Sequence, residues 1–134
     1  MTDAHAKLVL RGAGLFNVLG GGSILALPEW SSGVLYGKTF GPTDDLLRTY
    51  HFLLFGFVVA IGIGLWNSAN DPREGRGILI ASVLGKTLAA VTWLRMVAAH
   101  QGTTMLAIAS VADLAWAVVF VLVLRGLAAA SKPA

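Results

Sequence analysis

The sequence contains no cysteine, and this absence excludes disulfide bonds, thiolate metal sites and dithiol redox chemistry. Charged residues are also scarce: they make up 13% of the chain, against about 25% in soluble domains. The chain has no Gly-rich phosphate loop, no zinc-ligand spacing and no Ser nucleophile elbow. These absences argue against a soluble hydrolase or kinase, and they leave open whether the protein is an enzyme.

What the sequence does have is apolar surface. Hydrophobic residues make up 56% of the 134 residues, and the mean hydropathy is +0.74. The apolar residues gather in four stretches of about 20 residues, which is the length that crosses a bilayer as a helix. We therefore predict one all-α transmembrane domain, 1–134, folded as an up-down-up-down four-helix bundle with helices at about 8–27, 44–66, 72–99 and 104–124.

Proline and small polar residues set the limits of these helices. Pro28 should end the first helix, because its ring disfavours helix at the preceding residue. The connection from Pro28 to Pro42 could contain a re-entrant or amphipathic stretch. Thr43 is the expected N-cap of the second helix, and Asp71-Pro72 is a typical start for the third.

The turn between the third and fourth helices has its own signals. Gly102 is expected to close the third helix, and Thr103 is expected to cap the fourth.

Basic residues predict the orientation in the membrane. They occur singly at the ends of apolar runs and form no stripe with interleaved aromatics, so the pI of about 9.7 does not indicate nucleic-acid binding. One side of the predicted bundle carries six basic residues and the other three: Lys7, Arg11, Arg73, Arg76, Arg125 and Lys132 against Lys38, Arg48 and Arg95. The positive-inside rule then places both termini in the cytoplasm, and we expect a multi-pass protein of the bacterial inner (plasma) membrane.

Small residues recur at every fourth position on two helices, as smooth faces for close helix packing. They are Gly56, Ala60 and Gly64 on the second helix, and Gly77, Ala81, Gly85 and Ala89 on the third. We expect these faces to pack within the chain, with a dimer seam as the alternative.

Lys86 and Asp113 are the most informative residues. Each lies nine residues into its apolar helix, or about 14 Å deep, so both should be near the bilayer midplane. A lone charge at that depth costs at least about 2.5–3.5 kcal/mol, and we therefore predict that they pair. Ser82 and Trp93 share the Lys86 face at helical spacing, and Asn17 could join the pair. The pair could simply fix helix register, or it could serve a proton relay, a ligand site or an active site.

A second constellation is predicted near the outer surface. It consists of Arg48, Tyr50 and His51 on the second helix with Arg95 and His100 on the third. Such a cluster could bind an anionic group or a quinone oxygen, and His51 or His100 could ligate the iron of a b-type haem. The alternative without ligand binding is that these side chains anchor the helices at the membrane interface.

Four short motifs give the chain a resemblance to small bacterial four-helix membrane proteins, loosely similar in layout to DoxX-like proteins. These motifs are Arg11-Gly12-Ala13-Gly14-Leu15-Phe16-Asn17, Asp71-Pro72, Gly85-Lys86 and Asp113-Leu114-Ala115-Trp116. The resemblance implies the fold and the Lys86 and Asp113 pairing, and it implies no activity.

The leading hypothesis from the sequence is an accessory subunit of an inner-membrane assembly, with other membrane subunits or copies of itself as partners. The alternatives are a membrane-embedded enzyme or binding protein for an apolar small molecule, linked to haem or quinone, and a proton-coupled carrier.

Overall fold

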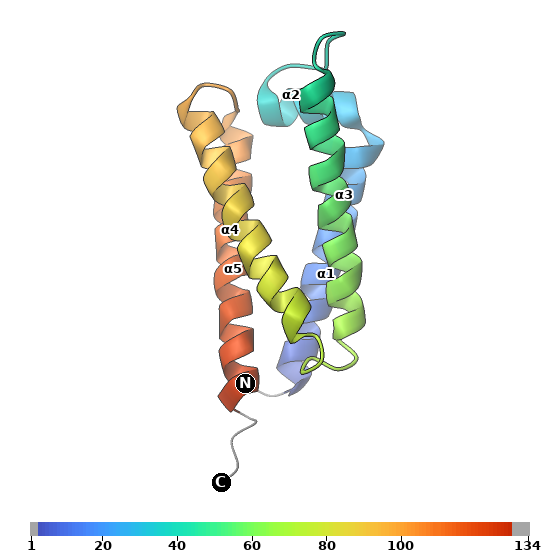
Figure 1. The fold of residues 1–134 in the computed structure, drawn as a ribbon, viewed down its shortest axis with the longest axis vertical. Coiled ribbons are helices and arrows are strands. Elements are labelled where there is room, and N and C mark those ends of the chain that lie inside the picture. The colour runs from blue at the N-terminus through green and yellow to red at the C-terminus, as the bar shows by residue number, and fades with distance from the viewer. Residues whose placement is uncertain (1–2, 130–134) are drawn as a thin grey trace.

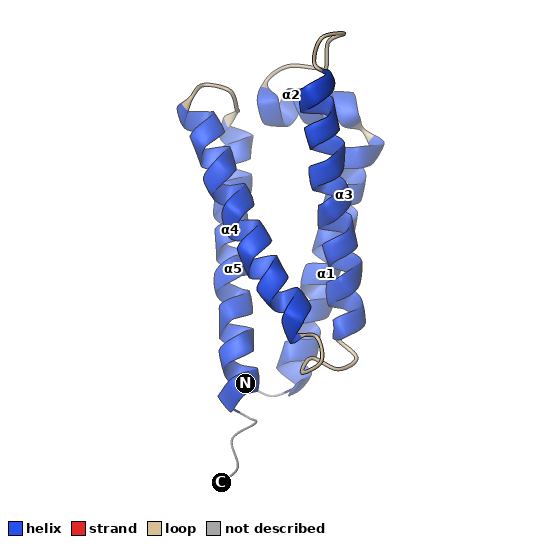
Figure 2. Cartoon of the chain, in the orientation of Figure 1, coloured by secondary structure: helices blue, strands red, loops and turns tan. Residues whose placement is uncertain are grey.

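The computed structural model describes residues 3–129, and all regular structure in that range is helical (Figures 1 and 2). The described residues form five helices: α1 (Asp3–Ala26), α2 (Pro28–Tyr36), α3 (Asp45–Ser68), α4 (Arg76–Ala98) and α5 (Thr104–Ala129). All except α2 are long and apolar enough to cross a membrane. The prediction of an all-helical fold with four helices long and apolar enough to span a membrane is therefore confirmed for residues 3–129, and the short α2 is an addition to it.

The four long helices turn apolar side chains outward. Leu53 on α3 and Leu88 on α4 are each 70% exposed, and Leu84 is 67% exposed. Large exposed apolar faces of this kind would make a soluble monomer aggregate, whereas in a bilayer they meet lipid tails. The composition of the faces thus fits a multi-pass membrane protein.

The segment from Pro28 onward is the first correction to the predicted helix limits. Pro28 ends α1 as expected, but it also occupies the first turn of α2, where a missing N–H costs nothing. The helix stops at Gly37, whose φ of 73° and N–H bond to the Gly33 carbonyl form a left-handed C-cap. The predicted connection therefore contains a nine-residue helix.

The other helix limits also shift. α4 begins at Arg76 and not at 72, because residues 72–75 form a turn in which the Asp71 carboxylate accepts from the Arg73 and Glu74 N–H groups at 3.0 and 3.4 Å. Gly102 was expected to close the third predicted helix, but the residue after α4 that has a positive φ, 58°, is His100. α1 begins earlier, and α5 ends later, than predicted.

Thr103 does not cap α5 with its hydroxyl. Its Oγ1 donates to the carbonyls of Val34 and Leu35 at 2.5 and 3.2 Å, and its backbone N–H donates to Leu35 at 3.0 Å. The α4–α5 turn is thereby tied to the end of α2, at one end of the molecule (Figure 1).

The helices pack as two pairs, α1 along α3 and α4 along α5, with fewer contacts between the pairs. α1 and α3 approach closely at Gly14 and Gly62, where a Cβ on Gly62 would lie 2.9 Å from the Gly14 oxygen. By contrast, a Cβ added at Gly56 or at Gly77 would meet nothing within 4 Å. The prediction that both small-residue faces pack within the chain is therefore wrong at these two residues.

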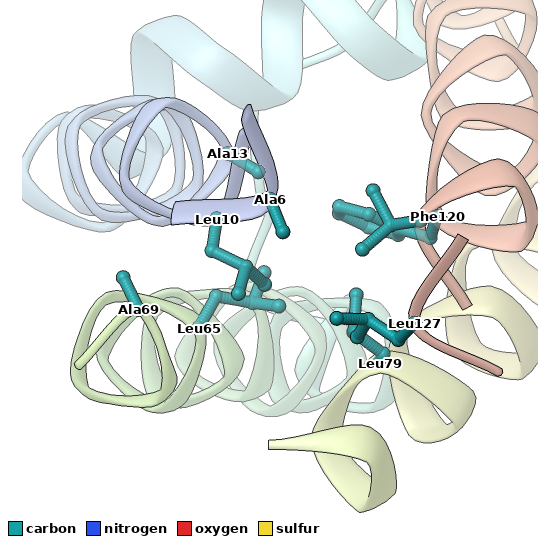
Figure 3. Packing of buried hydrophobic residues seen from close by; sticks show 9 residues of the cluster. Ala6, Leu10, Ala13, Leu65, Ala69, Leu79, Phe120 and Leu127 are labelled. Carbon is teal, nitrogen blue, oxygen red and sulfur yellow. The ribbon is translucent and has the colours of Figure 1, made fainter. Parts of the chain in front are cut away.

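The two pairs meet at both ends of the molecule. At the end where α1 begins, all four long helices contribute to one apolar cluster around Phe120 (Figure 3), made of Ala6, Leu10, Ala13, Leu65, Ala69, Leu79, Phe120, Val123 and Leu127. At the other end α2 joins a second cluster of Leu35, Tyr36, Phe55, Trp93 and Leu106. The space between these clusters is where the candidate site lies.

Candidate functional site

Lys86 and Asp113 meet between the two apolar clusters. The Lys86 Nζ donates to Asp113 Oδ1 at 2.6 Å, and the two side chains are only 10% and 15% exposed. Lys86 lies in the middle of α4, and Asp113 lies nine residues after the start of α5. The pairing expected from their matching depth is therefore present, and it joins α4 to α5 far from either end.

A single buried face of α4 positions Lys86. Leu79, Ser82, Lys86, Ala90 and Trp93 are the buried residues of this helix, and steps of three and four residues keep them on one side. Ser82 and Trp93 thus share the Lys86 face, as predicted. The Ser82 hydroxyl donates to the Ile78 carbonyl at 2.7 Å, within its own helix.

Two hollows flank the ion pair. The smaller, about 380 Å³ including its open side, lies between α3 and α4, and we call it the α3/α4 hollow. The larger, about 580 Å³ on the same measure, is bounded by all five helices, and we call it the α1/α5 hollow. Lys86, Asp113, Asn17 and Val58 line both hollows. Their other walls are mostly apolar, so the ion pair and Asn17 supply most of the polar chemistry.

Two further residues with polar side chains, Asn17 and Trp93, line the larger hollow. Asn17 is 3% exposed and lines both hollows. Trp93 lines the α1/α5 hollow, is 5% exposed, and its Nε1 has no hydrogen-bond partner among residues 3–129. Buried polar atoms in folded proteins are nearly always hydrogen-bonded, so the Trp93 Nε1–H group is an exception within the described residues.

Among residues 3–129, no hydrogen bond or ion pair joins the members of the predicted outer cluster to one another. Arg48 stacks over Phe40, 5.6 Å from the ring centre, whereas Arg95 is exposed on α4 and His100 is exposed on the turn after it. Tyr50 is partly buried at the start of α3. Exposure fits interfacial anchoring of Arg95 and His100, and the shared anion site stays a prediction.

His51 is the exception, because it is fully buried. Its Nε2 is hydrogen-bonded to the Ser31 hydroxyl and its Nδ1 to the Tyr36 hydroxyl, each at 3.2 Å. Phe40 and Phe55 hold the ring edge-on, with centroids 5.2 and 4.9 Å away. Both ring nitrogens are thus occupied within the chain, which removes His51 as a haem ligand in this conformation.

Sequence reasoning missed the partners of His51. Ser31 and Tyr36 belong to α2, and the pattern that could have found them is the buried set Ser31, Ser32, Leu35 and Tyr36, spaced as one helix face. Burial raises the pKa of the Tyr36 hydroxyl well above its usual range, so it stays a neutral partner. The arrangement fixes α2 against α3.

Lys38 and Asp44 form an ion pair in the loop between α2 and α3. Their Nζ and Oδ1 atoms are 2.8 Å apart, and Asp44 Oδ2 accepts from the Gly41 N–H at 2.9 Å. These bonds lower the pKa of Asp44 below its usual value, the Lys38 bond most.

Within residues 3–129 no group of three or more His, Asp or Glu side chains is arranged to hold a metal. The chain was compared with protein-family models, with curated proteins and with solved structures, and none of them matches. The resemblance to DoxX-like proteins therefore stays a prediction, and the function has to be argued from the hollows and the ion pair.

Proposed function

We propose that this protein binds a small, largely apolar molecule inside the membrane, in the α1/α5 hollow beside Lys86 and Asp113. The observation that carries the proposal is the hollow itself: about 580 Å³, mostly apolar walls, and a few buried polar groups converging on it. Ligand sites in proteins are concave and have this mixture of mostly apolar walls with a few polar groups.

The packing of the helices supports this function. α1 with α3, and α4 with α5, are each closely packed, while the two pairs meet mainly at the two apolar clusters. A molecule dissolved in the lipid could enter between the pairs without breaking either one. The chain carries large apolar faces outward, so lipid-dissolved molecules are the ones that reach it.

The ion pair has a part in this proposal beyond helix register. Lys86 has three N–H donors, of which one is used by Asp113 Oδ1. The remaining donors and the second carboxylate oxygen leave the pair able to orient a polar group of the ligand. This is a binding role, and it needs no chemical step.

The membrane placement belongs to the same proposal. The six-to-three distribution of basic residues supports an up-down-up-down path with both termini in the cytoplasm of a bacterial inner membrane. Because the chain has no cysteine, single cysteines at Asn70→Cys and Thr39→Cys can be labelled in intact cells with an impermeant maleimide. Labelling at Thr39→Cys but not at Asn70→Cys is expected, and the reverse pattern contradicts this orientation.

The ligand proposal is tested by filling the hollow. Ala109 lines it, one turn before Asp113, whereas Ala115 on the same helix is exposed. The wild type, Ala109→Phe and the control Ala115→Phe are purified from membranes, and small molecules in each are identified by mass spectrometry. A molecule enriched over bulk lipid in the wild type and the control, and lost from Ala109→Phe, is expected. No such enrichment in any of the three contradicts the proposal.

A second candidate is assembly with other membrane subunits or with a second copy of the chain. It is favoured by Gly56 and Gly77, where an added Cβ would meet nothing within 4 Å in the described part of this chain, although small residues in spanning helices usually allow close packing. Native mass spectrometry from mild detergent tests it: a larger complex is expected, and a monomer that remains intact at all detergent concentrations contradicts it.

A further inference from the structure

The Lys86 and Asp113 pair restricts what the proposed ligand can be. The bond between Lys86 Nζ and Asp113 Oδ1, 2.6 Å long, uses one of the three N–H donors of the lysine and one of the two carboxylate oxygens. Both side chains line the α1/α5 hollow, and 10% and 15% of their surfaces stay exposed. A molecule in the hollow can therefore reach the pair, which offers it both a donor and an acceptor.

The balance of charge around the hollow gives an independent second constraint. Of the described residues that line it, only Lys86 and Asp113 are charged, and their formal charges cancel. The same holds for the α3/α4 hollow on the other side of the pair. An ionised ligand group would therefore stand without a countercharge among apolar walls, where an unpaired charge is costly. The site favours an uncharged ligand.

We infer that the ligand is an uncharged apolar alcohol or phenol, whose hydroxyl accepts a hydrogen bond from Lys86 Nζ and donates one to the Asp113 carboxylate. The inference rests on the proposed function and specifies the ligand class for it. A hydroxyl donates and accepts through a single oxygen atom, which suits two partners whose own atoms are 2.6 Å apart. A carbonyl oxygen can only accept, so it pairs with the lysine alone, and a hydrocarbon pairs with neither.

Three uncharged probes of similar shape test the hydroxyl. Diphenylmethanol carries the hydroxyl, benzophenone has a carbonyl in its place, and diphenylmethane has neither. Binding of each to the chain in lipid nanodiscs is measured by equilibrium dialysis, with empty nanodiscs as the blank for partition into lipid. A hydrogen bond to a charged group changes binding by about tenfold or more. Diphenylmethanol should therefore bind more tightly than diphenylmethane by about that factor, with benzophenone between them.

Two charged probes with the same apolar body test the balance of charge. Diphenylacetate is an anion at neutral pH, and diphenylmethylamine is a cation. Both should bind the wild-type chain more weakly than diphenylmethanol. Asp113→Asn leaves the lysine charge unbalanced, so diphenylacetate should become the tightest of the five probes. Asp44→Asn is the matched control, because Asp44 belongs to the loop pair outside the hollow, and it should leave the ranking of the probes unchanged.

The possible outcomes separate this inference from the proposed function. If no probe binds above the blank, the proposed function itself fails. If diphenylmethane binds as tightly as diphenylmethanol, or if a charged probe binds the wild type best, the hollow binds ligands but the inferred class is wrong. Equal binding of benzophenone and diphenylmethanol removes the bond to Asp113 and also overturns the inference.

The ranking of the probes on the wild-type chain needs no variant, so it decides the ligand class even if Asp113→Asn fails to fold. A folded Asp113→Asn chain that keeps the wild-type ranking overturns the inference, because the ligand then does not contact the pair. The double variant Lys86→Met with Asp113→Leu removes every hydrogen-bonding atom of the pair and leaves no charge. It should bind diphenylmethanol no more tightly than diphenylmethane, and a preference that persists there places the hydroxyl elsewhere and contradicts the inference.

Discussion

Removing one member of the Lys86 and Asp113 pair should destabilise the protein far more than removing both. The two atoms are 2.6 Å apart, and the side chains are 10% and 15% exposed, so a single substitution leaves a charge buried in an apolar setting. Breaking a buried pair in this way costs about 3–5 kcal/mol. We expect Asp113→Asn, which leaves the lysine charge, to show this loss. The double variant Lys86→Met with Asp113→Asn should recover about 1–3 kcal/mol of it.

The assay is a double-mutant cycle on unfolding of the chain in mixed micelles, followed by circular dichroism. The control cycle uses Lys38→Met and Asp44→Asn, because that pair lies in a loop and its lysine is 54% exposed. A much smaller coupling is expected there, since solvent screens exposed pairs. Single variants at Lys86 and Asp113 whose effects simply add would refute the reasoning. If the double variant folds but no longer retains its ligand, the pair contributes to binding as well as to folding.

Three further predictions follow from individual contacts. Gly62→Ala should destabilise the packing of α1 on α3 by about 1–3 kcal/mol, because the new Cβ would lie 2.9 Å from atoms of α1. Gly56→Ala has open space around its Cβ and should be close to neutral. Melting temperatures in detergent compare the two variants. His51→Phe leaves a buried tyrosine hydroxyl unpaired and should cost about 1–3 kcal/mol. The exposed His100→Asn, which tolerates the positive φ of that position, should not lower the melting temperature. Because the pKa of Asp44 is lowered in the folded chain, its carboxylate stabilises the fold at neutral pH. This stabilisation is lost as the pH falls through the lowered pKa. The melting difference between wild type and Asp44→Asn should therefore shrink below about pH 4.

Two features of the fold were predictable from the sequence. One is set by the lipid surroundings of the chain, and the other by the depth of charged residues in the bilayer. Four apolar stretches long enough to cross a bilayer indicate four spanning helices, because lipid leaves no other partner for backbone groups. Lys86 and Asp113 could be paired in advance because two buried opposite charges at one depth need each other. Both inferences rest on a large free-energy penalty, that of leaving backbone polar groups or charged side chains unpaired in lipid. Few arrangements of the chain avoid this penalty.

The parts that were not predictable depend on contacts between distant residues. Nothing local to His51 identifies Ser31 and Tyr36 as its partners, since they lie beyond a loop on a helix that was itself missed. Regular spacing of glycine indicated smooth helix faces, but only close approach distinguishes Gly62, which packs, from Gly56, which does not. The hollow and the unpaired Trp93 Nε1 likewise exist only once the two helix pairs are placed.

The central claim, that a small apolar molecule is bound in the α1/α5 hollow, is tested most directly by photolabelling. Benzophenone itself reacts under ultraviolet light with the C–H bonds beside it, and mass spectrometry of the digested chain locates the adducts. In lipid nanodiscs, we expect adducts on residues that line the hollow, such as Ala109 and Ile24. Excess diphenylmethane should compete with benzophenone for the hollow and prevent these adducts. Adducts spread over lipid-facing residues such as Leu88, unaffected by the competitor, would contradict the claim.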